Sequence, residues 1–276
     1  MKSASRIVVA LIGVLAVIAT GVFVWVSFGT SQVSKGKVAF KGDIVGMADD
    51  MLAASAGATS AAAPAEAPAV PDGPLVFSHP GSSMVAYSAL GKMAIYSSPG
   101  GGQSRTLDNP TREGMQLIFG VKEDRGDWLR VQLPVRPNGS TGWVKKSDVL
   151  VKTVPNHIVV ETAKRRLSAW RGDTKLFETS VGVGTSKTPT PEGTFYVDFS
   201  VPNPGPGYGV HMLSVAGFSN VLRNFGGGTG QIAIHGTEAV HTVGQFSSNG
   251  CLRLTNADVK KLASIAAPGT PVFILP

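Results

Sequence analysis

The sequence has only one cysteine, Cys251, in 276 residues. A single thiol excludes an intramolecular disulfide, a CxxC redox pair, and a zinc or iron–sulfur site built from several cysteines. Charged residues are also scarce, at 16%, whereas hydrophobic residues make up 43%, so a wholly disordered chain is not expected. The 34 glycines and 18 prolines favour short strands and turns over long helices.

Long basic runs are missing too, although the formal net charge is +7. The longest run of Lys and Arg covers residues 164–166, and no basic helix is indicated, so we expect no nucleic-acid partner. A mildly basic protein is compatible with an anionic polymer of the cell envelope or with a membrane surface.

The N-terminal region contains the only long apolar stretch. Residues 7–28 carry no charge and are mostly apolar, which is long enough for a helix to span a bilayer. Lys2 and Arg6 precede this stretch and predict a cytoplasmic N-terminus. A cleaved signal peptide is the alternative, but its apolar region would be shorter and followed by small residues. We expect a cytoplasmic tip and single-pass membrane anchor over residues 1–30, with the remaining chain extracytoplasmic in the cell envelope.

Residues 31–74 lack the composition of a packed domain. Ten of the 21 residues from 51 to 71 are alanine and three are proline. Such a segment cannot bury a core, so we interpret residues 31–74 as an Ala/Pro-rich tether.

Residues 75–153 show short apolar runs between turn signals, which predicts a small β-barrel. The expected strands cover residues 84–87, 92–96, 116–121, 128–133 and 142–144. The segments around Trp128 and Trp143 resemble strand motifs of bacterial SH3-like domains. That resemblance leaves two interpretations open: a module that binds the cell wall or a partner, or a packing domain whose tryptophans are core.

Residues 154–276 form a second β-rich region. The expected strands cover residues 158–162, 166–170, 176–181, 193–199, 231–234 and 271–275. One short helix is predicted near the C-terminus, with Thr255 as its N-cap, Asp258 three residues later, and Pro268 after its end. The fold class is therefore mainly β, with a β-rich domain at the C-terminal end.

Cys251 follows a polar turn and begins a predicted strand. An exported thiol is a liability unless it is buried and inert or has a task. Backbone N–H groups of the turn could hold an oxyanion. Arg253 lies two residues later, so on a strand its side chain shares a face with the thiol and favours the thiolate. A small buried hydrophobe is the alternative interpretation.

His235 is the strongest candidate for a base that activates this thiol. It ends the apolar run 232–234 and precedes Cys251 by 16 residues, and a β-hairpin with a long loop would bring the two together. A zinc site formed by His235, His241 and Cys251 is an alternative, although no carboxylate base is obviously placed beside it. A papain-like order is excluded, because that order requires Cys before His.

Two segments carry a family resemblance: Ile-His-Gly-Thr at residues 234–237, and Ser-Asn-Gly-Cys-Leu-Arg at residues 248–253. They resemble the L,D-transpeptidase catalytic domain family of the YkuD type, as does the Thr-Pro-containing segment 188–195. The resemblance implies that Cys251 is the nucleophile, that His235 is the general base, and that the carbonyl group of Gly236 orients the imidazole.

The same resemblance implies a substrate-binding role for Arg253, Ser248, Asn249 and Gly250, with backbone N–H groups around Gly250 forming an oxyanion hole. Asn249 stands where the family often has histidine. That histidine is not the family's usual base, so we expect activity to be retained.

By resemblance, the function is a peptidoglycan L,D-transpeptidase that forms 3–3 cross-links between tetrapeptide stems through a cysteine thioester. No metal or organic cofactor is expected, and carbapenems are expected to acylate the thiol. An L,D-carboxypeptidase and a non-catalytic wall-binding scaffold are the alternatives. The glycine-rich segments 205–209 and 226–228 could form a lid over the substrate, or they could be ordinary surface loops.

Overall fold

The computed structural model describes residues 81–276, which belong to one compact unit. The predicted anchor and tether lie outside the described residues and stay predictions. Within residues 81–276, no helix has the length and hydrophobicity needed to cross a membrane.

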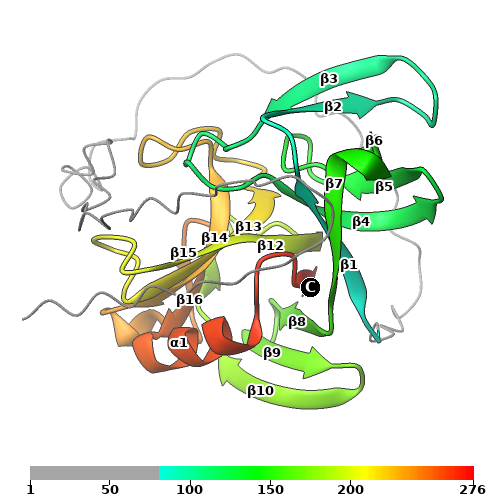
Figure 1. The fold of residues 1–276 in the computed structure, drawn as a ribbon. Helices are drawn as coiled ribbons and strands as arrows, with labels where there is room; N and C mark the ends of the chain where they lie inside the picture. Colours follow the sequence, from blue (N-terminus) through cyan, green and yellow to red (C-terminus); the bar gives the residue numbers. More distant parts are fainter. Residues whose placement is uncertain (1–80) are drawn as a thin grey trace, which may run out of the picture. The chain divides into compact units, whose positions relative to one another are not determined.

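The first part of the described chain forms a nearly closed antiparallel sheet of seven strands, in the order β3-β2-β6-β5-β4-β1-β7 (Figure 1). The strands are β1 (Ser83–Ser88), β2 (Lys92–Tyr96), β3 (Gln103–Asp108), β4 (Ile118–Arg125), β5 (Trp128–Gln132), β6 (Thr141–Lys145) and β7 (Val149–Val154), with the 3₁₀ turn η2 (Lys146–Asp148) before β7. All five expected strands are present. Two strands were not predicted from the sequence: β3, which is mostly polar and almost wholly exposed, and β7.

The two tryptophans of this sheet have different surroundings. Trp143 is buried, whereas Trp128 is half-buried and meets the ring of Tyr96 edge-on at 5.0 Å between centroids. Trp143 therefore belongs to the packed interior, and Trp128 keeps a surface that a partner could reach. The likeness to SH3-like domains stays a prediction.

The second part forms an eight-stranded sheet in the order β10-β9-β8-β17-β12-β13-β14-β16. Its strands are β8 (Asn156–Glu161), β9 (Arg166–Arg171), β10 (Thr174–Ser180), β12 (Gly193–Pro202), β13 (His211–Phe218), β14 (Gln231–Thr237), β16 (Leu252–Thr255) and β17 (Pro271–Leu275). A separate parallel pair joins β11 (Val183–Gly184) to β15 (Phe246–Ser248), and the 3₁₀ turn η3 (Val240–Thr242) precedes β15.

The connection from β14 to β16 differs from the expected hairpin. The two strands run parallel, with Ile234 opposite Leu252 and His235 opposite Arg253. Parallel neighbours require a crossover connection of a dozen or more residues, and residues 238–251 supply it. The hairpin prediction is therefore wrong, because the segment that separates the two motifs is long enough to return the chain in the same direction.

The predicted helix is present as α1 (Asn256–Ile265). The hydroxyl of Thr255 accepts the N–H of Asp258 at 3.1 Å, as expected of an N-cap. Val259 and Leu262 on the helix share a buried cluster with apolar residues of β13 and β14, so α1 covers one face of the sheet. Since side chains alternate along a strand, Ser214, Ala233 and His235 lie on the opposite face.

The two sheets meet at a small buried cluster. Val85, Ile118 and Val154 of the first sheet pack against Tyr196 of β12 and Ala216 of β13. The hydroxyl of Tyr196 is buried and donates to the carbonyl oxygen of Ile118 at 3.0 Å. Ala216 shares a face with Ser214, so the first sheet packs on the face that α1 leaves free. The predicted domain boundary at 153/154 stays a prediction.

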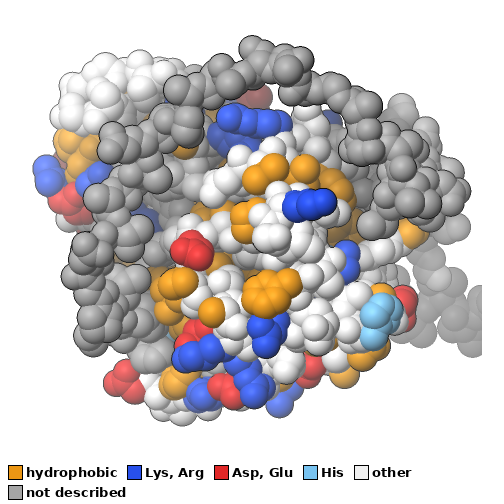
Figure 2. Space-filling model, turned by 180° about the vertical axis from the view of Figure 1, so that it is seen from behind, with side chains coloured by type: hydrophobic (Ala, Val, Ile, Leu, Met, Phe, Trp, Pro, Cys, Tyr) orange, Lys and Arg blue, Asp and Glu red, His pale blue; other side chains and the backbone are white. Residues whose placement is uncertain are grey.

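Charged side chains of both signs are interspersed on the face shown in Figure 2, with hydrophobic side chains between them. Lys175 and Glu178 form one of the ion pairs of the second sheet.

Candidate active site

The register of β14 and β16 places Cys251 beside His235. Cys251 immediately precedes β16 and therefore lies next to Ala233 in the parallel ladder. Because His235 is opposite Arg253 in the parallel ladder, the side chains of Cys251, Arg253 and His235 lie on the same face. That face is the one opposite α1.

The His235 imidazole is held by its own backbone neighbour. Its ring is buried, and Nδ1 donates to the carbonyl oxygen of Gly236 at 2.7 Å. Since a carbonyl oxygen only accepts, Nδ1 carries the proton and Nε2 is the basic atom. Burial, aided by the positive charge of Arg253 and opposed by the Gly236 hydrogen bond, lowers the pKa of His235 to about 4. The imidazole is therefore neutral at neutral pH.

The Cys251 side chain is also uncharged at rest. Burial raises the pKa of the thiol, and this effect is opposed by the Ala233 N–H and by the nearby Arg253 guanidinium. A neutral thiol beside a neutral imidazole suits general-base activation, in which the proton leaves sulfur as sulfur attacks.

The turn before Cys251 is organised by Ser248. The buried Ser248 hydroxyl donates to the carbonyl oxygen of Cys251 at 2.6 Å and accepts the N–H of Gly250 at 3.1 Å. Gly250 has a φ of +111°, a conformation that side-chain-bearing residues rarely adopt. Ser248 therefore shapes the turn. Its hydroxyl already accepts the hydrogen bond of the Gly250 N–H, which is one of the groups that we expected to form the oxyanion hole.

Two other predicted residues flank the site. Asn249 is exposed at the tip of the turn. Its side chain makes no hydrogen bond to residues 81–276. Arg253 is half-buried, and its Nη1 donates to the carbonyl oxygen of Ser247 at 3.3 Å. The guanidinium nevertheless stays close enough to influence the pKa values of both His235 and Cys251.

Tyr208 is a site residue that sequence reasoning missed. Its ring meets the His235 ring at 4.9 Å between centroids, and its pKa is raised by burial and by the nearby Cys251. The segment 205–209 therefore reaches the site. The other glycine-rich segment, 226–228, is held at Gly227 by Arg112 of the first sheet region. An aromatic residue within a Gly-Pro loop was the only sequence signal for Tyr208.

The segment that carries Tyr208 is fixed at its C-terminal end. Gly209 has a φ of +64°, and a β-carbon there would lie 2.5 Å from the carbonyl carbon of Gly236. The side-chain oxygen of Asn256, the first residue of α1, accepts the N–H of Val210 at 3.1 Å. The loop is thus anchored beside the carbonyl that binds His235.

The proposed zinc cluster does not form within residues 81–276. His241 is exposed on η3, and no three His, Cys, Asp or Glu side chains of this part of the chain are grouped to hold a metal ion.

Fold and site together define a mainly β protein in which a thiol and a buried imidazole lie on the same face of two neighbouring parallel strands. The model of the L,D-transpeptidase catalytic domain family matches residues 155–274. YkuD of Bacillus licheniformis, which carries the name of an L,D-transpeptidase, is 35% identical over 124 residues, covering 45% of this chain and 68% of that protein. YkuD of Bacillus subtilis is 34% identical over 122 residues, covering 44% and 67%.

The chain belongs to the L,D-transpeptidase catalytic domain family. Among solved structures, Bd1075 of Bdellovibrio bacteriovorus is similar, with 26% identity, a TM-score of 0.36, and coverage of 44% of this chain and 47% of that one.

Proposed function

We propose that the protein is a peptidoglycan L,D-transpeptidase that makes 3–3 cross-links through a thioester on Cys251. The observation that carries the proposal is the parallel register of β14 and β16, which puts the thiol beside an imidazole whose Nδ1 proton is bound by Gly236. Membership of the family supplies the reaction class.

In the first half-reaction, the Cys251 sulfur bonds to the carbonyl carbon of the stem's third residue while His235 Nε2 takes the thiol proton. The backbone N–H of Cys251 stabilises the oxyanion. The bond to the terminal D-Ala nitrogen then breaks, and His235 returns the proton to that leaving amine. The products are a thioester and free D-Ala.

In the second half-reaction, the side-chain amine of another stem attacks the thioester carbonyl. His235 takes a proton from the attacking nitrogen, the carbon–sulfur bond breaks, and the proton returns to the sulfur of Cys251. Water in place of the amine would give an L,D-carboxypeptidase, and a scaffold would carry out neither step.

The location follows from the same proposal. Residues 7–28 would anchor the chain in the cell membrane and residues 31–74 would tether it, so that Cys251 acts in the cell envelope. The first sheet would be an accessory module beside the second sheet, whose strands place Cys251.

Acylation by a carbapenem tests the nucleophile. The full chain incubated with a carbapenem should gain the mass of one adduct, and Cys251→Ala should gain none, because Cys251 is the only thiol. His235→Gln should slow adduct formation by about 100-fold or more, as expected when general-base help is lost. Intact-mass spectrometry over time measures both effects.

If the wild-type chain gains no carbapenem adduct, the proposed role of Cys251 as the nucleophile is wrong. Incubation with a disaccharide-tetrapeptide then distinguishes the activities: cross-linked dimers indicate transpeptidation, tripeptide with no dimer indicates hydrolysis, and unchanged substrate indicates a scaffold.

A further inference from the structure

A cavity of about 560 Å³ lies between the first sheet and the second. Its lining comes from β3 and the connection that follows it, from the hairpin between β5 and β6, and from β12, β13 and β14 with their connections. Neither Cys251 nor His235 belongs to this lining, so the cavity is separate from the site that holds the thiol. Its volume lies within the range of small-molecule binding sites.

One end of the cavity is acidic. Asp198 of β12 is only 7% exposed, and its Oδ2 accepts from the side-chain amide of Gln231 at 3.0 Å. The other carboxylate oxygen has no hydrogen-bond donor among residues 81–276. Burial, opposed by the Gln231 hydrogen bond and reinforced by the charge of Glu113, raises the pKa of Asp198 to about 6, so this carboxyl group is mostly ionised at neutral pH. A buried carboxylate with a second negative charge nearby favours a cation.

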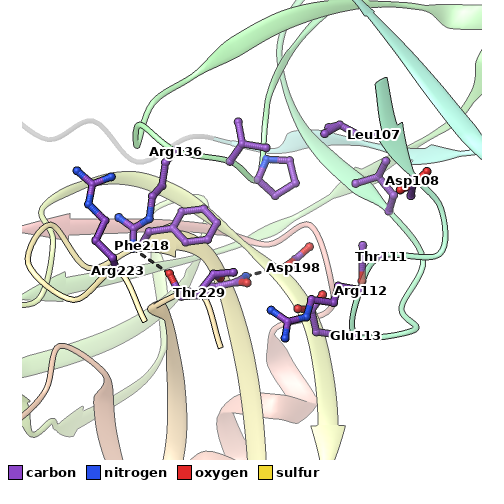
Figure 3. A pocket seen from close by; sticks show the side chains of 14 residues that line it. Leu107, Asp108, Thr111, Arg112, Glu113, Arg136, Asp198, Phe218, Arg223 and Thr229 are labelled. Atoms are coloured by element: carbon purple, nitrogen blue, oxygen red, sulfur yellow. Dashed lines mark hydrogen bonds between the residues drawn. The ribbon is translucent and has the colours of Figure 1, made fainter. Parts of the chain in front are cut away.

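The other end of the cavity is basic. Figure 3 shows Arg136 and Arg223 toward one end, and Asp198 and Glu113 toward the other. Burial and the positive charge of Arg223 lower the pKa of Arg136. Three backbone carbonyl oxygens accept from Arg136 at 2.7–2.9 Å, whereas Arg223 makes no hydrogen bond within residues 81–276. Because a guanidinium has five N–H donors, both arginines keep donors for an anion.

The charges at the two ends have no ionic partner within residues 81–276, because none of the ion pairs there includes them. Two further charged side chains of the lining are already engaged. Asp108 pairs with Lys92, and Arg112 donates to the carbonyl oxygen of Gly227 at 3.2 Å. An unpaired charge is costly where the group is buried, so a ligand of opposite charge would be favoured at the acidic end.

Much of the remaining lining is apolar. The guanidinium of Arg136 lies over the Phe218 ring at 5.0 Å, so the basic end adjoins an aromatic surface. The apolar lining residues are Leu107, Leu117, Pro134, Val135 and Phe218. In small-molecule sites such surface contacts the nonpolar part of the ligand, while a few polar groups fix its orientation.

We propose that this cavity binds a small zwitterion with an apolar side chain, its ammonium group at Asp198 and its carboxylate at Arg223 and Arg136. Free amino acids and dipeptides share this chemistry. Such a ligand brings an opposite charge to each end and adds no net charge to the cavity. The binding is independent of the proposed function, because no residue that acts on the thioester lines the cavity.

Three matched probes test the two charges in the full chain. Leucine carries both charges, leucinamide lacks the carboxylate, and N-acetyl-leucine lacks the ammonium group. Isothermal titration calorimetry at neutral pH should show that leucine binds about 10- to 100-fold more tightly than either derivative, the range expected when a charge-assisted hydrogen bond is lost.

Variants at each end assign the charges to residues. Asp198→Asn should weaken leucine binding about 10- to 100-fold without weakening the binding of N-acetyl-leucine, which has no ammonium group to lose. Arg223→Gln should weaken leucine binding about 10-fold without weakening the binding of leucinamide. Asp173→Asn and Arg105→Gln, at exposed positions outside the lining, are the matched controls and should bind leucine like the wild type.

Melting temperatures show whether each variant is folded, and the three probes test the wild-type chain even if a variant is not. Leucylglycine distinguishes the two sources: tighter binding than leucine indicates a short peptide, and weaker binding indicates a free amino acid. A wild-type chain that binds neither at about 10 mM overturns the proposal. Equal affinities for leucine and its two derivatives, or a folded Asp198→Asn variant that binds leucine like the wild type, also overturn it.

Discussion

His235 and Cys251 are both uncharged at neutral pH because burial disfavours the charged form of each. The Gly236 carbonyl fixes which nitrogen of His235 is basic. The resting protein therefore has no preformed thiolate, and the thiol proton must leave Cys251 while its sulfur attacks the substrate.

This protonation state predicts an unusual pH profile. The pKa of His235 is lowered to about 4, so the base stays neutral down to that pH and becomes protonated only below it. The rate of Cys251 acylation by a carbapenem should therefore change less than about twofold between pH 5.5 and pH 7.5. Stopped-flow or mass-resolved kinetics measure the profile. A tenfold loss per pH unit beginning near pH 6.5 would show that the histidine titrates normally and would contradict the prediction.

Individual site residues were partly predictable from the sequence. His235, Gly236 and Cys251 occur in short local motifs, and the structure brings them together. Tyr208 could not be found in this way, because its contact with His235 depends on how a loop folds back over β14.

At the scale of elements, the loop that carries Tyr208 depends on one glycine. At Gly209 a β-carbon would collide with the backbone of Gly236, whereas at Gly207, with a φ of +84°, nothing lies within 4 Å of such an atom. Both positions have positive φ, so alanine costs about 1 kcal/mol at either one. Only Gly209 adds a collision beside the residue whose carbonyl oxygen binds the His235 imidazole.

We therefore expect Gly209→Ala to slow Cys251 acylation by about 10- to 100-fold, because small displacements of a reacting group have large effects. Gly207→Ala is the control and should stay within about twofold of the wild-type rate. Equal rates for the two variants would show that the close approach of Gly209 to Gly236 has no catalytic consequence.

Strands with apolar alternation and the capped helix were predictable as elements. β3 was not predicted, because its residues are mostly polar and exposed and no periodic pattern marks the strand. The parallel pairing of β14 with β16 was also beyond local reasoning. Spacing alone does not show whether a chain returns by a hairpin or a crossover, and the pairing is decided by the shared core of Ile234, Leu252 and Leu254 under α1.

At the scale of the whole molecule, Arg136 joins the first sheet to the second. Its guanidinium donates to three carbonyl oxygens of residues 219–229 and lies over the Phe218 ring at 5.0 Å. Asn138 of the same hairpin donates to the Phe218 carbonyl oxygen at 2.8 Å. These contacts link the hairpin between β5 and β6 to the connection between β13 and β14.

Arg136→Ala should therefore destabilise the protein by about 2 kcal/mol, because three acceptors lose a charged donor at once. Thermal unfolding should show a melting temperature lower by about 4–8 °C for a domain of this size. Arg130→Ala is the control, since the side chain of the exposed Arg130 hydrogen-bonds, within residues 81–276, only to the Thr141 hydroxyl at 3.3–3.4 Å. Equal shifts for the two variants would show that the link across the sheets does not contribute to stability.

The parallel ladder between β14 and β16 also has an evolutionary consequence. The relative position of His235 and Cys251 is set by hydrogen bonds between two neighbouring strands, not by the length of the chain that joins them. Residues 238–245, which precede β15, can therefore accept insertions or deletions while both reacting groups stay in place.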